Sequence, residues 1–365
     1  MRREAATTRD LPPPWRVPLL VLAFVSLAVG TAAGLARLGW GFAAPAAAHG
    51  PLMIAAFFGT VIALERAVAV GARWAYLGPL ASGLAGLALA TGAGTGYAAP
   101  LAAAGSLVLF AATLTIFARQ KALFTFTLVL GALAALVASL ARAGGDEAWQ
   151  VTPWWIGFLV LTIAGERLEL SRFLRPSPLA QGAFAAIVAW LALALVATAF
   201  TPGPAAASFG AGLVALALWL VRHDIARRTV REAGLTRFIA MALLAGYVWL
   251  ALGGAAIVAA GGLAPGAPGR DAALHMILAG FVLSMVFGHA PIIFPAVLGV
   301  RMPYSPAAYV PLAVLHATLA VRVAGDYAND AGMRSAGGMG NALALVLFVL
   351  VTAGAVLRGA RARPG

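Results

Sequence analysis

The sequence predicts an all-α integral membrane protein, a polytopic bundle of about twelve transmembrane helices, and two observations predict this class. The chain is 62% hydrophobic and only 10% charged, whereas a soluble domain of this length carries about 25% charged residues. Apolar runs of nearly 20 residues recur from Trp15 to Leu357, separated by short polar or Gly/Pro breaks. Each run is long enough to cross the roughly 30 Å of a bilayer's hydrocarbon core. A soluble fold would expose most of this apolar surface, so we exclude it.

The breaks between apolar runs predict the individual helices in order. The twelve expected spans are approximately residues 17–36, 47–69, 75–94, 98–118, 122–141, 150–171, 179–200, 205–222, 236–262, 272–297, 304–323 and 336–357. Pro291 and Pro295 are expected to kink or end the inner part of the tenth span, because proline lacks the N–H that a helix uses. We expect residues 1–365 to form a single membrane domain, in which residues 1–16 precede the 17–357 bundle and residues 358–365 form a tail.

The positions of the basic residues predict the orientation. Of the 25 Lys and Arg residues, 20 fall on cytoplasmic segments when the N-terminus is placed inside. The five on external segments are Arg37, Arg142, Arg270, Arg322 and Arg334. This asymmetry follows the positive-inside rule and places both termini in the cytoplasm. It also explains the net charge of +13 by a basic face beside anionic lipid, without a nucleic-acid partner. The nearly exclusive use of Arg over Lys is typical of a GC-rich bacterial genome, so we expect the bacterial cytoplasmic (inner) membrane.

A faint internal similarity suggests three units of four helices. The second span ends in Ala63-Leu64-Glu65-Arg66 and the sixth in Ala164-Gly165-Glu166-Arg167. The tenth span shares a Gly- and Phe-rich centre with the second. Repeats of this kind indicate a duplicated helical unit, although membrane helices also resemble one another by composition alone.

Histidines are the informative polar residues of the bundle. With no cysteine in the chain, any metal must rely on His, Met or carboxylate ligands. His49 and His275 open the second and tenth spans at their outer ends, and His316 lies near the middle of the eleventh span or in its outer half. Neutral imidazole is a common ligand of heme iron, copper and zinc. Three such residues in one outer layer predict a cofactor site; the alternative is that each imidazole only makes local hydrogen bonds.

A second metal site nearer the cytoplasm is conceivable at His289. This residue follows His275 by fourteen positions and precedes Pro291. Prolines free backbone carbonyls that must find another partner. A kinked helix with a locally bonded His289 is the favoured interpretation. No carboxylate is expected near the bilayer centre, which argues against a proton pump, and no nucleotide-binding or nucleophile motif is present, so no catalytic residue is assigned.

Two short motifs resemble heme–copper oxidase catalytic subunits and, more closely, the NnrS-like membrane proteins, a family linked to nitric oxide stress and described as binding heme and copper. His49-Gly50-Pro51-Leu52-Met53 resembles the opening of the oxidases' second span, and His275 followed by Gly280-Phe281 resembles the opening of their tenth. The resemblance implies one heme held by His49 and His275, with His316 or His289 as extra metal ligands and copper as a second cofactor. It also implies a small gaseous or apolar ligand and a role in nitric oxide response or respiratory redox chemistry.

The sixth and seventh spans depart from the oxidase pattern because neither contains a histidine. The oxygen-reducing heme–copper centre therefore cannot be built in its usual form, and oxygen reduction is not implied. Two other functions remain open from the residues alone. One is a small-solute permease without a cofactor, which would have a cavity flanked by broken helices. The other is a membrane assembly factor.

Overall fold

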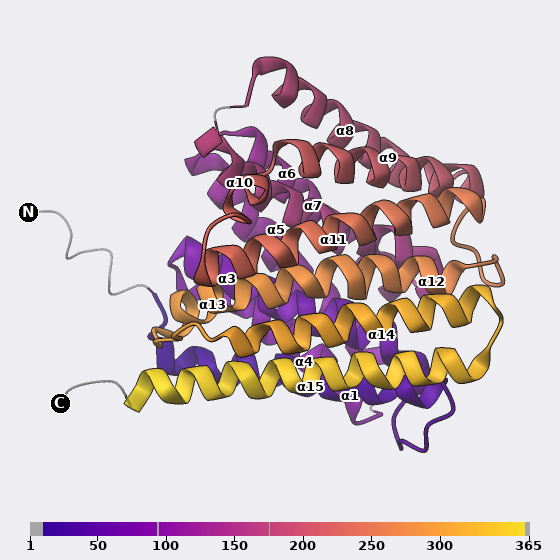
Figure 1. Ribbon diagram of the computed structural model, residues 1–365, viewed down its shortest axis with the longest axis horizontal. Helices are drawn as coiled ribbons and strands as arrows, with labels where there is room; N and C mark the ends of the chain where they lie inside the picture. The colour runs from indigo at the N-terminus through magenta and orange to yellow at the C-terminus, as the bar shows by residue number, and fades with distance from the viewer. Residues whose placement is uncertain (1–9, 93–94, 175, 362–365) are drawn as a thin grey trace, which may run out of the picture. The chain divides into compact units, whose positions relative to one another are not determined.

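The computed structural model of the protein describes residues 10–92, 95–174 and 176–361, and within these ranges every regular element is helical (Figure 1). The main helices are α1 (Pro13–Arg37), α2 (His49–Pro51), α3 (Gly59–Val70), α4 (Leu77–Ala90), α5 (Thr95–Arg119), α6 (Leu123–Ala143), α7 (Ala148–Ser171), α8 (Pro178–Ala197), α9 (Pro202–His223), α10 (Ala226–Thr229), α11 (Gly234–Ala259), α12 (Arg270–His275), α13 (Ser284–Leu298), α14 (Tyr309–Tyr327) and α15 (Ala331–Arg361). Two π-helical segments are η2 (Leu52–Phe58) and η5 (Met276–Leu283), and the short 3₁₀ turns are η1 (Ala46–Ala48), η3 (Arg73–Tyr76), η4 (Arg172–Leu174) and η6 (Pro306–Ala308).

Within the described residues, each of the twelve predicted ranges falls largely on a helix or on an unbroken run of helical segments, and residues 93–94 of the third range lie outside the described part of the chain. Ten of these, within the described residues, are long and apolar enough to cross a membrane. The other two are α4, which has only 14 residues, and α7, whose last turns carry Glu166, Arg167 and Glu169. The chain is therefore an all-helical, multi-pass membrane protein in contact with lipid, while the count of twelve spans and the orientation stay predictions.

Some sequence predictions fall on residues outside the described ranges. The N-terminal segment is described only from Asp10, and the C-terminal tail only to Arg361. Five arginines that contribute to the predicted charge asymmetry lie outside the described residues, namely Arg2, Arg3, Arg9, Arg175 and Arg363.

The chain divides into two compact units, and each is described by itself. Unit 1 comprises the residues up to Phe158 with Ala296–Gly299, and unit 2 comprises Leu159–Pro295 with the residues from Val300 onward. The boundary falls inside α7, so it does not coincide with the ends of the predicted groups of four helices, and the threefold repeat remains a prediction.

Unit 1 is built around α4. This helix packs against α1, α3 and α5, and α5 packs in turn against α6. Small residues make these approaches close: a Cβ at Gly86 would lie 2.0 Å from Ser26 Oγ of α1, and one at Gly105 would lie 2.3 Å from Ser82 Oγ of α4. Tight packing through small residues is the usual way helices associate in lipid, where the hydrophobic effect between helices is absent.

Unit 2 is a row of helices in chain order. Helix α8 packs on α9, α9 on α11, α11 on η5, η5 on α14, and α14 on α15 (Figure 1). The connections between successive helices are short, which makes neighbours antiparallel.

The second and tenth predicted spans share an irregularity that the sequence analysis did not foresee. Each contains a π-helical segment, η2 in one and η5 in the other. The prolines do not end the helix, because α13 continues through Pro291 and Pro295 to Leu298, and a kink at these residues stays a prediction. The wider turn therefore lies upstream of the prolines, directly after His275. π-Helical turns inside α-helices are rare and are often found at functional sites.

Candidate functional site

His49 stands at the start of α2, where its ring is held by α1. Its Nδ1 lies 2.7 Å from the carbonyl oxygen of Gly30. Because a carbonyl oxygen can only accept, Nδ1 carries the proton. The ring also lies against Gly34, one turn further along α1: a Cβ there would be 2.8 Å from both Cε1 and Nδ1 of the imidazole. The two glycines of this G-x-x-x-G pair thus give the histidine access to the backbone of α1.

His275 is the last residue of α12, and its ring is held by the preceding turn. Its Nδ1 lies 2.8 Å from the carbonyl oxygen of Asp271, and the carboxylate of the same residue is 3.4 Å away. Arg322 of α14 donates from Nη2 to that carboxylate at 2.8 Å. The proton of His275 is therefore also on Nδ1, and a charged pair steadies the turn that carries the ring.

The two histidines share one arrangement, His49 in unit 1 and His275 in unit 2. In each, Nδ1–H is bonded to a backbone carbonyl, so the ring in its neutral form has its lone pair on Nε2. In each, a π-helical segment follows within three residues. Metal-bound histidines nearly always donate their second ring nitrogen to a carbonyl or carboxylate, which orients the ring and raises its basicity. Both residues therefore fit the requirements of an iron ligand.

His316 lies within a hydrogen-bonded chain inside unit 2. Trp249 of α11 donates from Nε1 to Nδ1 of the histidine at 2.9 Å, and the two rings are nearly parallel, at 10°. On the other side, Nε2 lies 3.4 Å from Ser284 Oγ, which itself donates to the carbonyl of Gly280 at 2.6 Å. Both ring nitrogens are thus directed at protein groups.

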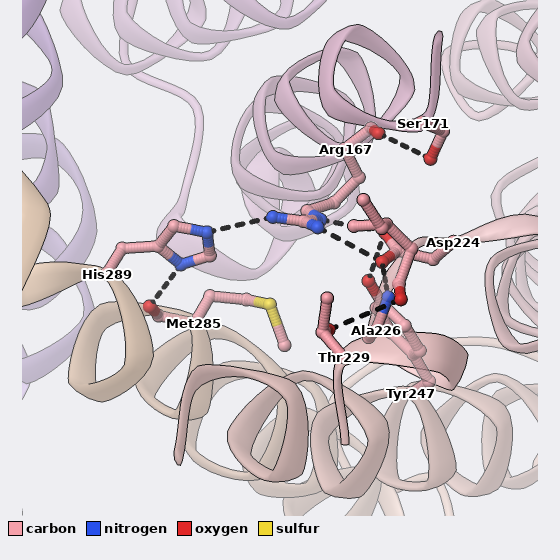
Figure 2. A network of polar contacts seen from close by, with 9 residues as sticks. Arg167, Ser171, Asp224, Ala226, Thr229, Tyr247, Met285 and His289 are labelled. Carbon is pink, nitrogen blue, oxygen red and sulfur yellow. Dashed lines mark hydrogen bonds and ion pairs between the residues drawn. The ribbon is translucent and has the colours of Figure 1, made fainter. Parts of the chain in front are cut away.

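A buried charge network, which we call the Arg167 network, joins the last turns of α7 and the residue after α9 to α11 and α13 in unit 2 (Figure 2). Arg167 of α7 donates from Nε and Nη2 to the two carboxylate oxygens of Asp224, at 2.8 and 3.0 Å. The side chains are 2% and 0% exposed. Two parallel bonds between a guanidinium and a carboxylate are the strongest geometry for such a pair.

Two further donors complete the coordination of Asp224. Tyr247 of α11 donates its hydroxyl at 2.9 Å, and the backbone N–H of Ala226 donates at 2.7 Å. The carboxylate therefore accepts four hydrogen bonds, which offsets the cost of burying its charge.

His289 is the fourth side chain of the Arg167 network. Its Nδ1–H donates to the carbonyl of Met285 at 2.7 Å, and its Nε2 lies 3.1 Å from Nη1 of Arg167 (Figure 2). An arginine can only donate, so Nε2 is an acceptor and the ring is neutral. The local bonding favoured for this residue from the sequence is what the structure shows.

The predicted extra metal ligands are thus occupied. A metal on Nε2 of His289 would have to displace Arg167, and one on His316 would have to displace Trp249 or Ser284. Across the described residues, the structure gathers no group of three or more His, Asp or Glu side chains that could hold a metal ion. The geometry gives the predicted copper no support.

The partners of Arg167 were not predicted from the sequence. Arg167 was expected to be one of the cytoplasmic basic residues, and no role was expected for Asp224 or Tyr247. One signal was present: Asp224 is the only acidic residue between Glu169 and Glu232, in a stretch rich in arginine. A lone carboxylate among many cations is well placed to pair with one of them, but the sequence does not say which.

A hollow of about 380 Å³ adjoins the network on the loop between α9 and α11. Its ionisable lining residues are Arg222, His223, Asp224, Arg227, Arg228 and Arg231. Asp224 is already neutralised by Arg167, so the exposed arginines dominate the potential here. This is the most basic loop of the chain and was predicted to face the cytoplasm.

A comparison with curated proteins finds no match. A family model, described as a domain of unknown function (DUF8744), matches residues 16–357. The matched region begins in α1 and ends in α15, so it includes both histidine sites and the whole Arg167 network. Because the model covers nearly the entire chain, the protein belongs to the DUF8744 family.

Proposed function

We propose that this protein is a heme-binding, multi-pass protein of the bacterial cytoplasmic membrane, with His49 and His275 as iron ligands. The observation that carries the proposal is the shared state of the two rings. Each has Nδ1–H bonded to a backbone carbonyl, at 2.7 and 2.8 Å, and its lone pair on Nε2. This is the form of imidazole that binds iron.

The residues of the chain supply the orientation of the two ligands. The carbonyl oxygen of Gly30 accepts a hydrogen bond from His49 Nδ1–H, and Gly34 leaves space for the ring. The carbonyl and the carboxylate of Asp271 hold the ring of His275. A hydrogen bond from Nδ1–H makes an imidazole a stronger donor to iron and favours the oxidised metal. A bound heme would supply binding of a diatomic gas or one-electron transfer, in line with the nitric oxide role that the resemblance implies.

An optical spectrum of the purified protein tests the proposal. Expressed with sufficient heme, the wild-type protein should show a Soret band and bound iron. His49→Ala and His275→Ala should each lose the band or change its position and intensity. His223→Ala is the control, because that ring is stacked on Trp219 in the basic loop and should leave the spectrum unchanged.

The form of the change shows whether the two imidazoles share one iron. With a shared iron, each single variant converts a six-coordinate low-spin spectrum into a five-coordinate one, and imidazole added to the buffer restores it. With separate irons, each variant removes only part of the heme. A colourless wild-type protein without iron, or a spectrum that neither histidine variant changes, would refute the proposal.

A second variant moves a ring without removing it. An added methyl group at Gly34 would meet the His49 ring at 2.8 Å, so Gly34→Ala should shift the Soret band or lower heme occupancy. Gly182→Ala on α8 is the matched control, since no atom lies within 4 Å of its added Cβ.

A further inference from the structure

Unit 1 contains an apolar cavity of about 270 Å³. Its walls come from the segment that runs from η1 into η2 and from α4, α5, α6 and α7. The lining is mostly alanine, proline and leucine, among them Pro51, Ala55, Leu89 and Ala102. A volume of about 270 Å³ is too small for a porphyrin, so the inference below concerns a smaller molecule.

One polar group in the wall has no partner. Trp155 of α7 lines the cavity and is 4% exposed, and its indole N–H makes no hydrogen bond within the described part of the chain. A buried donor left unsatisfied costs about 1–3 kcal/mol, and most such groups in proteins are satisfied by protein, water or a ligand. An indole can only donate. Trp155 therefore brings one unsatisfied hydrogen-bond donor beside the cavity, and this donor needs an acceptor.

The neighbouring hydroxyls do not supply that acceptor. Ser139 also lines the cavity, and its Oγ lies 2.9 Å from Ser106 Oγ. The Ser106 hydroxyl donates a hydrogen bond to the carbonyl oxygen of Ala102 at 2.9 Å. Ser139 must therefore be the donor to Ser106. The two serines are satisfied by each other and by the backbone. They form a polar edge that bears no charge.

One charged side chain lines the cavity. Among the described residues, Arg142 is the one ionisable lining residue, and its Nη1 donates to the carbonyl oxygen of Asp146. The rest of the lining is uncharged and mostly apolar, so an ionic ligand would lose its hydration with little compensation, which is costly. The site therefore selects for a neutral molecule.

A much smaller gap adjoins the cavity and offers a competing partner. It measures about 10 Å³ and is lined by Ser82, Ser106, Ser139 and Trp155, among others. This is near the smallest volume that holds one water molecule. A single water in this gap would satisfy the indole without any ligand in the larger cavity, and the experiment below separates the two cases.

We propose that the cavity of unit 1 binds a small, neutral, apolar molecule with one acceptor oxygen, such as an aromatic or cyclic ketone, and that this oxygen accepts from the Trp155 indole. The apolar walls bind the carbon skeleton, and the N–H selects for the oxygen. Apolar walls with a few polar groups that orient the ligand are typical of small-molecule sites.

Two probes that differ only at the carbonyl test the hydrogen bond. We would measure binding of 4-fluoroacetophenone and of 1-ethyl-4-fluorobenzene to the full-length protein in nanodiscs by ¹⁹F NMR, with empty nanodiscs correcting for partition into lipid. Both should bind saturably. The ketone should bind roughly twofold to tenfold more tightly, as expected of one net hydrogen bond.

Substitutions assign the two contributions. Trp155→Phe removes the N–H but keeps an aromatic ring, so it should abolish the preference for the ketone, while Trp154→Phe on the same helix should preserve it. Ala102→Leu fills the cavity and should weaken both probes at least tenfold. Its control, Ala104→Leu, changes an exposed residue of the same helix and should leave binding intact.

The following results would contradict the proposal. Equal affinity for the two probes in the wild type, or a ketone preference that survives Trp155→Phe, would show that water or protein already satisfies the indole. Binding that Ala102→Leu does not reduce would place the probes elsewhere. Absence of saturable binding of either probe would remove the site altogether.

Discussion

Single residues decide where charge is tolerated inside this protein. Asp224 lies in a basic loop by sequence, yet its side chain is 0% exposed and accepts hydrogen bonds from Arg167, Tyr247 and Ala226. By contrast, the pair formed by Arg172 and Glu169, one turn beyond Arg167, is 53% and 39% exposed. Exposed pairs of this kind contribute little to stability, whereas breaking a buried pair leaves an uncompensated charge.

Removing the carboxylate should therefore be costly. Asp224→Ala leaves the Arg167 guanidinium buried without a counter-charge, and we expect a loss of about 3–5 kcal/mol. The measurement is thermal unfolding of detergent-purified protein, in which the variant should melt well below the wild type. Glu169→Ala, the exposed control, should cost less than about 1 kcal/mol.

Replacing both partners separates charge from packing. The double variant Arg167→Met, Asp224→Leu removes the uncompensated charge and should recover most of the loss seen in Asp224→Ala. If Asp224→Ala has the same melting temperature as the wild type, the Arg167 network does not stabilise unit 2.

Helices in this protein approach one another through glycine. Gly210 of α9 and Gly254 of α11 face each other: a Cβ on the first would lie 2.7 Å from the carbonyl oxygen of the second, and the reverse distance is 2.6 Å. The backbones are thus in direct contact. Such small-residue contacts replace the hydrophobic effect, which does not drive helix association in lipid.

A single methyl group should disturb this contact. Gly254→Ala forces α9 and α11 apart, because the obstacle is backbone and cannot rotate away, and overpacking of this kind costs about 1–3 kcal/mol. The melting temperature should fall. Gly182→Ala on α8 has no atom within 4 Å of the added Cβ and should leave the melting temperature equal or raise it, since alanine favours helix. Equal melting of both variants would show that the two helices can separate without loss.

At the scale of the whole molecule, the predicted orientation depends on how many helices cross the membrane. Ten meet the length and hydropathy expected of a span. Helix α4 is short and α7 carries charge near its end, yet the positive-inside pattern requires both to cross. If either lay along the membrane surface, the predicted sides of the following loops would be exchanged.

The absence of cysteine allows this to be tested by labelling. Single-cysteine variants at Gly96 and Asp146 should react with a membrane-impermeant thiol reagent in intact cells. Variants at Ala72 and Phe173 should react only after the membrane is opened. Ala72 and Gly96 flank α4, and Asp146 and Phe173 flank α7. Labelling of both members of a pair from the same side would show that the enclosed helix does not span.

Much of the fold could be predicted because each helix must satisfy its own backbone in lipid, which makes length and hydropathy sufficient. The twelve helical ranges and the positions of His49, His275 and His316 at helix starts and centres follow from this local rule. The π-helical segments η2 and η5 could not be predicted. They depend on how one turn packs against neighbouring helices, and the composition of Leu52–Phe58 fits an α-helix equally well.

The class of protein, its helical segments and the histidines whose chemistry suits a cofactor follow from the order of the amino acids. How those side chains are bonded became known only from the folded chain. It bonds His289 to Arg167 and His316 to Trp249, while the Nδ1–H of His49 and of His275 is bonded to a backbone carbonyl. It also leaves the Trp155 indole unpaired beside a cavity. Hydropathy can be read from one segment of the sequence, because it is a local property. Most of these hydrogen bonds cannot, because they join residues that are far apart in the sequence and meet only in the folded chain.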